Sequence, residues 1–331
     1  MTLLKNLIQQ NVNFAKWRLP QKENYNFIVE GESNSGTDST KFIINPFNSH
    51  TKDESFYISK DKNDISLKQD IFIPKQTTKE QYLDLVKKTV LSIRNGNQKK
   101  VVISRVEIHH RQENCSLAKI FDSLCEKHPT AFIFCYHHRQ LGTWIGATPE
   151  QLIRNEKNGF STMALAGTKS LDDKSPWRKK EIEEHQFVIN DLVNKVKTLN
   201  GKNIKQHVTE TISTGIVKHL HTKITFQSNK SIPEISQHFH PTPAVCGTPT
   251  KSALEFILKN EEHDRSCYTG YIGPIEDSSA NLFVNLRSMQ VTDSKFILYL
   301  GGGITSSSDP EKEWEETKNK SQTMLSVIQK C

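Results

Sequence analysis

The feature that most constrains the fold of this chain is the way its predicted strands follow one another with few helices between them. The segment 131–154, AFIFCYHHRQLGTWIGATPEQLIR, predicts a hairpin with strands at 131–137 and 143–146 and a turn at 140–142. Three more strands are predicted in succession, at 268–272, 281–290 and 295–300. Strict alternation of strands with helices is typical of a doubly wound sheet, whereas adjacent strands favour an α+β fold. The sequence therefore predicts an α+β fold.

Helices are predicted where apolar residues recur every three or four positions and capping residues flank the run. The first covers 78–94, with Thr77 and Glu80 as a capping box. The last begins at Pro310, with Asp309 as its N-cap. The other predicted elements are helices at 116–126, 175–199 and 251–259, a strand at 100–108, and a short strand over 160–170 that breaks at Gly167.

The first 75 residues are polar and carry few structural signals. Only three short apolar pieces, at 26–30, 41–46 and 70–74, suggest strands there. No internal repeat, low-complexity linker or break in composition separates this part from the remainder. We therefore treat residues 1–75 as a divergent N-terminal part of the same domain as residues 76–331.

The excess of positive charge leaves two kinds of partner open. The chain has 44 Lys and Arg against 37 Asp and Glu, a net charge of +7. Such an excess suits nucleic acid, and it equally suits a small anionic substrate. The lysines are dispersed, with no basic helix and no aromatic RNA-binding pattern, so nucleic-acid binding is kept only as a remote alternative.

Nothing in the sequence points to a membrane or to secretion. No apolar run approaches the roughly 20 residues that span a bilayer. The N-terminus lacks the apolar core and the small-residue cleavage site of a secretory signal. The six cysteines are scattered without CxxC spacing, which favours reduced thiols over a disulfide framework or a zinc site. We therefore expect a cytoplasmic protein.

The segment 300–324, LGGGITSSSDPEKEWEETKNKSQTM, joins a glycine run to a helix rich in glutamate. A phosphate-binding Walker loop is excluded, because GxxxxGK[ST] is absent and no lysine follows the glycines directly. A solvated helix edge is the commoner interpretation, and inward-facing carboxylates that hold Mg²⁺ are the alternative. Helical spacing places two carboxylates, a lysine and apolar residues along one face: Glu313, Glu316, Thr317, Lys320, Met324 and Val327.

Three further side chains are candidates on their own chemistry. Glu184 lies on the long helix, opposite its main apolar stripe. Lys100 opens an apolar strand, where a lysine can lose its charge by desolvation and act as a base. Glu150 follows Thr148-Pro149 and could lie in a first helical turn. A helix dipole there would favour the charged carboxylate and oppose a general-acid role, unless burial or a neighbouring carboxylate outweighed it. For Glu184 and Lys100 taken singly, a solvated side chain is the commoner interpretation.

Eight short motifs occur in order over roughly residues 75–331. They are KVVISR, GATPEQLI, ALAGTK, EEHQFVINDLV, HPTPAVCGTP, DRSCYTGYIG, NLRSM and GGGITSSSDPEKEWEETKNK. Together they resemble the chorismate-utilising enzyme family, isochorismate synthase type. The resemblance implies one α+β domain built as a multilayer αββα sandwich, with residues 76–331 as the chorismate-binding catalytic region and Mg²⁺ as cofactor. Thr248 of the CGTP turn departs from relatives that often carry an aromatic or another residue there.

The resemblance also implies roles for residues at matching motif positions. Glu184 of EEH and Glu316 of EWEE would ligate the metal, which would bridge them to the ring carboxylate of chorismate. Tyr268 and Arg287 would bind the enolpyruvyl carboxylate. The remaining substrate contacts would come from backbone at Gly167, Gly301 and Gly303 and from the side chains of His219 and Lys320.

Two positions distinguish the reactions within this family. Members that use ammonia, such as anthranilate synthase component I, carry glutamine where this chain has Lys100. Aminodeoxychorismate synthases carry a nucleophilic lysine where it has Ala166. Lysine at the first position and alanine at the second resemble isochorismate and salicylate synthases, which use water. Lys100 would then accept a proton from water attacking ring C2, and Glu150 would protonate the departing C4 hydroxyl.

The resemblance therefore implies an isomerase, a Mg²⁺-dependent isochorismate synthase that acts on chorismate for menaquinone or siderophore biosynthesis. It implies no glutaminase subunit, because water is the nucleophile. Salicylate synthase, which continues by eliminating pyruvate from isochorismate, is the alternative, and no residue separates the two cleanly.

Overall fold

Every strand pair in the described part of the chain is antiparallel, and the strands form two sheets. The computed structural model describes residues 2–32, 39–49, 54–61, 73–214, 217–276 and 279–329. In spatial order the first sheet contains β13 (Gly247–Thr248), β5 (Lys100–His110), β17 (Lys295–Ile304), β16 (Ser288–Val291), β7 (Gly142–Thr148), β6 (Phe132–His138), β1 (Phe14–Arg18) and β2 (Asn26–Val29).

The second sheet draws its strands from different parts of the chain. β11 (Glu210–Thr214) lies off its main path and pairs with β12. In spatial order the path contains β10 (Lys202–Gln206), β12 (Val217–Gln227), β9 (Gly159–Ser170), β8 (Gln151–Glu156), β15 (Ser279–Val284), β14 (Tyr271–Glu276), β3 (Lys41–Asn45) and β4 (Phe56–Ile58). The N-terminal strands thus divide between the sheets, β1 and β2 in the first and β3 and β4 in the second.

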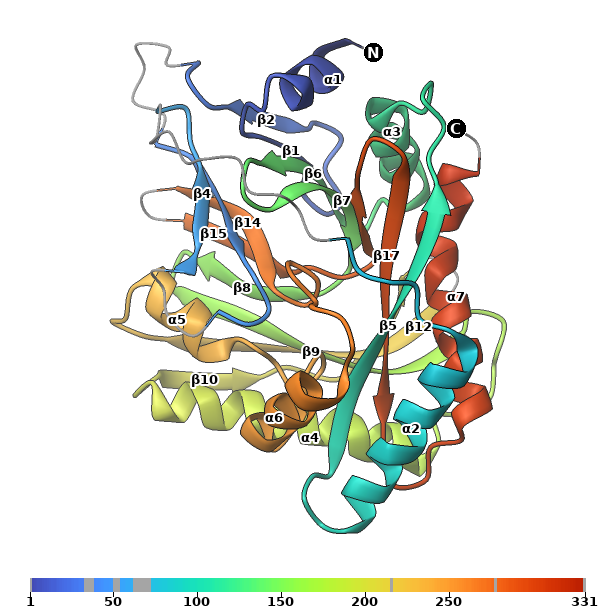
Figure 1. Cartoon of the computed structure of the whole chain (residues 1–331). Helices are drawn as coiled ribbons and strands as arrows, with labels where there is room; N and C mark the ends of the chain where they lie inside the picture. The colour runs from blue at the N-terminus through green and yellow to red at the C-terminus, as the bar shows by residue number, and fades with distance from the viewer. Residues whose placement is uncertain are drawn as a thin grey trace.

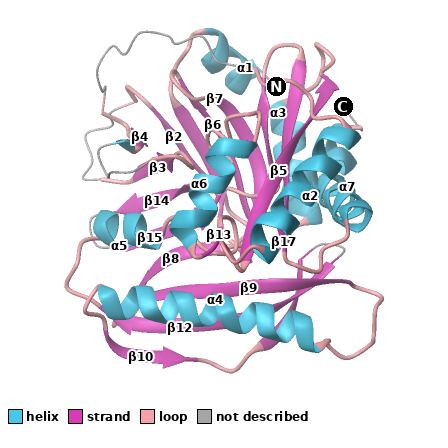
Figure 2. Cartoon of the chain, turned by 60° about the horizontal axis from the view of Figure 1, so that its bottom comes forward, coloured by secondary structure: helices cyan, strands magenta, loops and turns pink. Residues whose placement is uncertain are grey.

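Helices pack on the outer side of each sheet (Figure 1). On the first sheet, α2 and α7 lie along β5 and β17, α3 lies on β6 and β7, and α6 lies beside β5 and β13. On the second sheet, α4 lies along β9 and β12, and α5 lies on β8 (Figure 2). The helices are α1 (Thr2–Gln9), α2 (Lys79–Arg94), α3 (Leu117–Lys127), α4 (Lys179–Thr198), α5 (Ile232–Phe239), α6 (Thr250–Asn260) and α7 (Pro310–Ile328).

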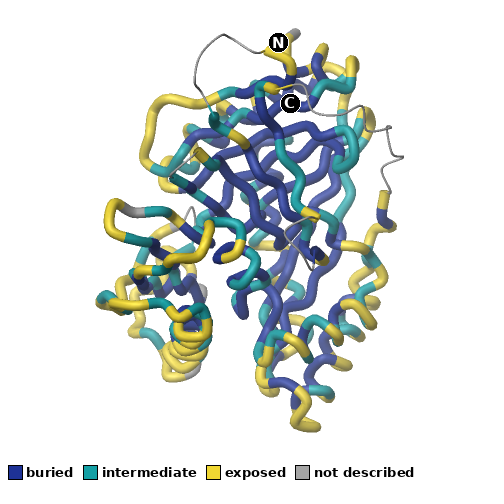
Figure 3. The backbone as a smooth tube through the Cα atoms, turned by 90° about the vertical axis from the view of Figure 1, so that its left-hand side faces the viewer, coloured by how far each residue is buried: buried dark blue, intermediate teal, exposed yellow. Residues whose placement is uncertain are grey.

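The core is layered in the same way. One apolar cluster lies between the first sheet and its helices, another between the second sheet and α4 and α5, and a third between the two sheets. In the third, Phe132 of β6 stacks on Phe283 of β15 with ring centroids 4.2 Å apart. Figure 3 shows the buried backbone concentrated in the strands, with exposed backbone along the helices and loops. The predicted αββα sandwich is confirmed.

Several predicted local elements are wrong in detail. The capping box of α2 is formed by Thr78 and Gln81, whereas the hydroxyl of Thr77 accepts a hydrogen bond from the backbone N–H of Val106 in β5. β9 does not break at Gly167, because the strand continues to Ser170 with a shift in its register against β12. Asp309 does cap α7, as predicted. The predicted strand at 70–74 falls largely outside the described residues.

Two short crossings of the chain between the sheets lie next to each other, and this arrangement prepares the site. The first crossing, Pro149-Glu150, joins β7 to β8. Glu150 therefore lies between two strands, and the first helical turn considered for it from the sequence is not present. The second, residues 285–287, joins β15 to β16 and divides the predicted strand at 281–290. The crossings are bonded together: the Thr148 hydroxyl donates to the Val284 carbonyl at 2.6 Å, and Val284 N–H donates to the Glu150 carbonyl.

Candidate active site

All eleven side chains and backbone positions predicted to act on substrate or metal line one pocket. The pocket holds about 840 Å³ of space free of protein atoms, part of it open to solvent. It lies where the first sheet meets the second, with walls from both sheets, from α4 and from α7. The predicted residues that line it are Lys100, Glu150, Gly167, Glu184, His219, Tyr268, Arg287, Gly301, Gly303, Glu316 and Lys320.

Lys100 and Glu184 form an ion pair at one side of the pocket. Lys100 begins β5 and Glu184 lies in α4, and their Nζ and Oε1 atoms are 2.6 Å apart. Both side chains are largely buried, with 12% and 23% exposure. Gly303 makes room for the lysine, because a Cβ there would lie only 2.8 Å from Lys100 Cε. Neither residue is the solvated side chain that its position alone would suggest.

Glu150 is buried in the pocket wall and is 5% exposed. Burial raises the pKa of its carboxyl group to about 7, although the positive charge of Lys100 and a hydrogen bond from the Thr242 hydroxyl act in the opposite direction. A carboxyl group with a pKa near neutrality can deliver a proton at physiological pH. Glu150 therefore has the burial that an acid role requires at this position.

A second ion pair lies along α7. Lys320 Nζ donates to Glu316 Oε1 at 2.6 Å and to the carbonyl oxygen of Gly301 at 2.8 Å. The positive charge of Lys320 is the main reason that the pKa of Glu316 is lowered. Asp309 starts α7 so that Glu313, Thr317, Met324 and Val327 are buried on one face, while Glu316 and Lys320 lie at the edge of that face toward the pocket.

Tyr268 and Arg287 are contributed by turns and not by strands. Tyr268 precedes β14 and stacks on Tyr299 of β17 with ring centroids 5.6 Å apart. Burial raises the pKa of its hydroxyl to about 12, so it remains a hydrogen-bond donor. A Cβ at Gly301 would come within 2.9 Å of that hydroxyl. Arg287 donates to Thr323 Oγ1 of α7 at 3.2 Å, which places its guanidinium between β16 and α7.

His219 and Gly167 meet across strands β12 and β9. His219 Nδ1 lies 2.8 Å from the carbonyl oxygen of Gly167. Burial lowers the pKa of His219 to about 4, so the ring is neutral near pH 7. A carbonyl only accepts, so the ring proton is on Nδ1 and Nε2 is an acceptor. Gly167 adopts φ +69, and a Cβ there would lie 3.3 Å from Glu181 Cβ and 3.5 Å from Trp177.

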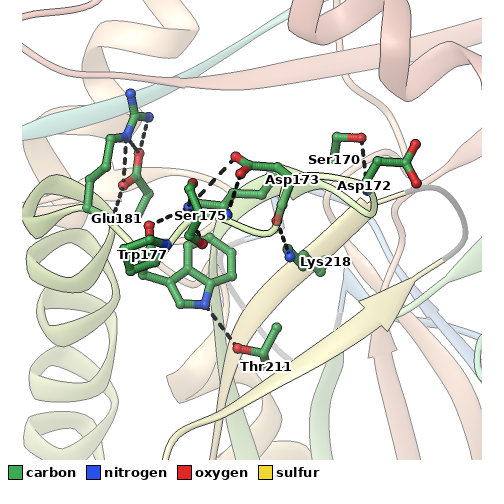
Figure 4. Close-up of polar contacts among 11 residues, drawn as sticks. Ser170, Asp172, Asp173, Ser175, Trp177, Glu181, Thr211 and Lys218 are labelled. Atoms are coloured by element: carbon green, nitrogen blue, oxygen red, sulfur yellow. Dashed lines mark hydrogen bonds and ion pairs between the residues drawn. The ribbon is translucent and has the colours of Figure 1, made fainter.

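The loop between β9 and α4 closes over Gly167. Trp177 is held in place by a 2.9 Å hydrogen bond from its indole N–H to Thr211 Oγ1 (Figure 4). Lys169 Nζ donates to Ser175 Oγ at 2.9 Å and to the Pro176 carbonyl at 2.6 Å. These contacts fix the loop against the strand and thereby fix the backbone of Gly167 at the pocket.

Sequence reasoning missed part of the pocket lining. Ala244 and Val245 belong to the HPTPAVCGTP motif, which was noticed but given no site residue. The others are apolar or small residues beside assigned ones, and only the fold shows that they reach the pocket. They are Val102, Pro149, Leu165, Ala166, Thr269, Leu286, Tyr299, Leu300 and Gly302.

The residues present fit a magnesium ion that is shared with an anionic ligand. Mg²⁺ is commonly bound through one or two carboxylates, waters and oxygen atoms of the ligand. Glu184 and Glu316 provide two carboxylates to one pocket from different helices. Among the described residues, no group of three or more His, Cys, Asp or Glu side chains could hold a metal on its own. A bound cation would therefore depend on the ligand as well as on these two residues.

Four of the cysteines, Cys125, Cys135, Cys246 and Cys267, are free thiols, as expected. Cys115 is disulfide-bonded, so the expectation of reduced thiols is wrong at that position. Within the described residues, no helix is both long enough and apolar enough to cross a membrane.

A family model described as "Chorismate binding enzyme" matches residues 3–329. The match includes most of the first 75 residues, in which no motif was found. Isochorismate synthase MenF of Escherichia coli is 28% identical over 267 residues, which cover 77% of this chain and 61% of that protein. The vibriobactin-specific isochorismate synthase of Vibrio cholerae is 30% identical over 266 residues, covering 75% and 66%.

Similarity to solved structures extends over nearly the whole chain. The menaquinone-specific isochorismate synthase MenF of Escherichia coli superimposes with a TM-score of 0.79 at 20% identity, covering 96% of this chain and 88% of that one. At that identity the likeness shows the fold. By sequence, the chain matches about three fifths of the length of the two MenF relatives from Escherichia coli and Haemophilus influenzae.

Proposed function

The chain belongs to the chorismate-binding enzyme family, and we propose that it is a Mg²⁺-dependent isochorismate synthase. The observation that carries this proposal is that Lys100 and Glu150 line the same pocket as Glu184 and Glu316. A base, an acid and two carboxylates for a cation are the groups that exchange of a ring hydroxyl with water requires. The names of the curated relatives support the same reaction.

The proposed reaction begins with water and ends with water. In this reaction Lys100 accepts a proton from water as the water oxygen bonds to C2 of chorismate. Both ring double bonds shift by one position, and the C4–O bond breaks as Glu150 gives its proton to the departing hydroxyl. One water is consumed and one is released, so the net change is isomerisation. Proton exchange with solvent then restores both groups.

The other pocket residues orient the substrate. Tyr268 and Arg287 provide a hydroxyl donor and a guanidinium for the enolpyruvyl carboxylate. The Nε2 atom of His219 is an acceptor, so it would receive a hydrogen bond from a substrate hydroxyl. When Mg²⁺ is bound by Glu184 and Glu316, it supplies positive charge that offsets the substrate carboxylates. Water is the nucleophile, so no glutaminase subunit is needed.

Product analysis tests this proposal directly. The purified protein is incubated with chorismate and Mg²⁺, and the products are identified by chromatography and mass spectrometry. We expect isochorismate, with no dependence on ammonia. Salicylate and pyruvate as the main products would assign the pyruvate-eliminating reaction to this site instead. No conversion of chorismate would contradict both assignments.

A further inference from the structure

Arg265 of the DRSCYTGYIG motif forms a buried ion pair with Glu261 that the proposed reaction does not use. Glu261 and Arg265 lie just after α6, and each side chain is 2% exposed. Arg265 donates from Nε to Glu261 Oε2 at 2.8 Å and from Nη2 to Glu261 Oε1 at 2.6 Å. This is a two-bond pairing, the geometry that makes arginine–carboxylate pairs strong and orienting.

Arg265 also joins three other segments of the chain. Its Nη2 donates to the carbonyl oxygen of Val102 in β5 at 2.7 Å, and its Nη1 donates to the carbonyl oxygen of Val245 at 3.0 Å. Nη1 further contacts Thr269 Oγ1 at 3.3 Å. All five N–H groups of the guanidinium are thereby used. Val102, Val245 and Thr269 line the pocket, whereas Arg265 itself is not among the lining residues.

Glu261 fixes the other end of this arrangement. Its Oε1 accepts the backbone N–H of Ser104 at 2.6 Å, and its Oε2 accepts the Ser104 hydroxyl at 3.0 Å. Ser104 lies opposite Gly301 in the β5–β17 pairing. The ion pair is therefore anchored to β5, the strand that begins with Lys100 and pairs with the strand of the glycine run.

The turn held by Arg265 has a strained backbone. Ser266 has φ 49 and Thr269 has φ 62. Left-handed backbone at a β-branched residue is uncommon and costs free energy, so the surroundings must maintain it. Tyr268 lies inside this turn, and its N–H donates to the carbonyl oxygen of Arg265 at 2.8 Å. The position of the Tyr268 ring therefore depends on where Arg265 holds the turn.

The same turn is bonded to the segment that carries Arg287. Thr269 N–H donates to the Asn285 carbonyl, and Asn285 N–H donates to the Gly270 carbonyl, each at 2.8 Å. Arg287, two residues further on, is also in the left-handed region, with φ 48. Two strained turns are thus paired through their backbones, and only one of them is tied to the ion pair.

We propose that Arg265, paired with Glu261, is a positioning residue that sets the spacing of Tyr268 and Arg287 in the pocket. The inference rests on the proposed function, in which these two residues bind the enolpyruvyl carboxylate. A displaced turn would move the Tyr268 hydroxyl and the Arg287 guanidinium relative to one another. A carboxylate that both must contact would then bind less tightly in the ground state and the transition state alike.

The test separates binding from chemistry. Replacement of the guanidinium in Arg265→Met should raise KM for chorismate by on the order of 10-fold to 100-fold, as expected when a distant change misplaces contacting groups. The change in kcat should be smaller, because uniform binding is what is lost. Arg265→Lys should give an intermediate KM, since an ammonium has three donors where the guanidinium uses five. Calorimetric titration of chorismate into the same variants on a Lys100→Ala background should give parallel changes in Kd.

Arg18→Met is the matched control. Arg18 is also buried and donates to the backbone carbonyls of Cys125, His128 and Ala131, none of which lines the pocket. This variant should lose thermal stability and keep the KM of wild type. Should Arg265→Met not fold, Glu261→Met/Arg265→Met removes both buried charges together and leaves no unpaired one.

The outcomes are distinct. A rise in KM and Kd in the Arg265 variants and not in Arg18→Met supports the proposal. Equal KM values in Arg265 and Arg18 variants of similar thermal stability would show that Arg265 only stabilises the fold. If wild type neither binds nor converts chorismate, the proposed function fails first and this inference fails with it.

Discussion

The Nζ atom of Lys100 lies 2.6 Å from Oε1 of Glu184, so the predicted base is bonded to a predicted metal ligand. Lys320 and Glu316 form a second pair of the same kind, also at 2.6 Å. The four charges are thus held as two neutral pairs. A cation bound by Glu184 and Glu316 would therefore have to compete with the two lysines for the same carboxylates.

Replacement of Lys100 should remove the base. We expect Lys100→Ala to lower kcat by about 100-fold to 10,000-fold, the range typical of a lost general base, and to leave chorismate and Mg²⁺ binding largely intact. Lys100→Gln copies the residue of the ammonia-using relatives, so it should lose water attack and could permit slow reaction with added ammonia. Stopped assays with chorismate measure both. A Lys100→Ala variant that keeps a tenth of wild-type turnover would rule out the base assignment.

Glu150 should control the pH dependence of the chemical step. Since its pKa is raised to about 7 in the ligand-free protein and its proposed role is that of an acid, kcat/KM should fall as pH rises through about 7. Glu150→Gln should lower kcat at every pH by about 100-fold or more, because an amide cannot donate the proton. Rate measurements from pH 5.5 to 9 test this. An unchanged descending limb in Glu150→Gln would assign the titration to another group.

The same carboxyl group should affect stability. Its pKa in the folded protein is above the ordinary value of 4.5, so its contribution is complete below pH 4.5 and is lost as pH rises through about 7. The loss should reach about 3 kcal/mol of unfolding free energy. Glu150→Gln lacks this dependence and should gain stability relative to wild type at pH 8 and not at pH 4.5. Urea unfolding at the two pH values measures the difference.

Glu184 and Glu316 should act on metal and substrate together. Glu184→Gln and Glu316→Gln should raise the Mg²⁺ concentration needed for half-maximal activity and weaken chorismate binding in parallel, since a shared cation links the two. Exposed neighbours provide controls: Glu183→Gln on α4 and Glu315→Gln on α7, whose partners are the surface lysines Lys179 and Lys318. Manganese binding followed by electron paramagnetic resonance gives a readout independent of turnover. Equal Mg²⁺ requirements in all four variants would refute the ligand assignment.

Within the glycine run, substitution by alanine should reduce activity only where the new methyl group points toward Lys100. In Gly303→Ala the new methyl would meet Lys100 Cε at 2.8 Å, so the lysine must move while the backbone stays in place. We expect a large loss of kcat with little change in melting temperature. In Gly302→Ala the methyl would face Tyr82 and Glu313 on the other side of the strand, at 3.2 and 3.5 Å from their oxygens, and would leave Lys100 undisturbed. Similar losses in both variants would contradict this account.

Local sequence patterns predicted the helices and strands more accurately than they predicted the connections between them. Adjacent strands indicated an α+β fold, and capping residues located α7 to the residue. The sequence predicts a single strand over 281–290, and the structure has two. Its division depends on the left-handed backbone at Arg287 and on pairing with two different sheets. Those are long-range properties that a local pattern does not contain.

In the candidate site, too, the local sequence indicated which residues matter, and only the fold shows their surroundings. Taken alone, Glu184 and Lys100 fit solvated side chains, and only their approach across more than eighty residues of chain makes them a buried pair. The family resemblance assigned eleven residues that all line one pocket, but it did not indicate their burial or their hydrogen-bond partners. The position of Glu150 between two strands, and the burial that raises its pKa, follow from the fold and were not visible in Thr148-Pro149-Glu150 itself.

The two short crossings between the sheets, at Pro149-Glu150 and 285–287, limit where the chain can change length. The hairpin turns at 157–158 and 292–294 are largely exposed, so an inserted residue there would lengthen a loop and leave both sheets unchanged. At Pro149-Glu150 and 285–287 the number of residues fixes the separation of the sheets, and each crossing is bonded to the other. A single insertion or deletion at either place would shift a proton donor or a cationic contact by a whole residue. Laboratory libraries that vary loop length should therefore recover active chains from the hairpins and almost none from the crossings.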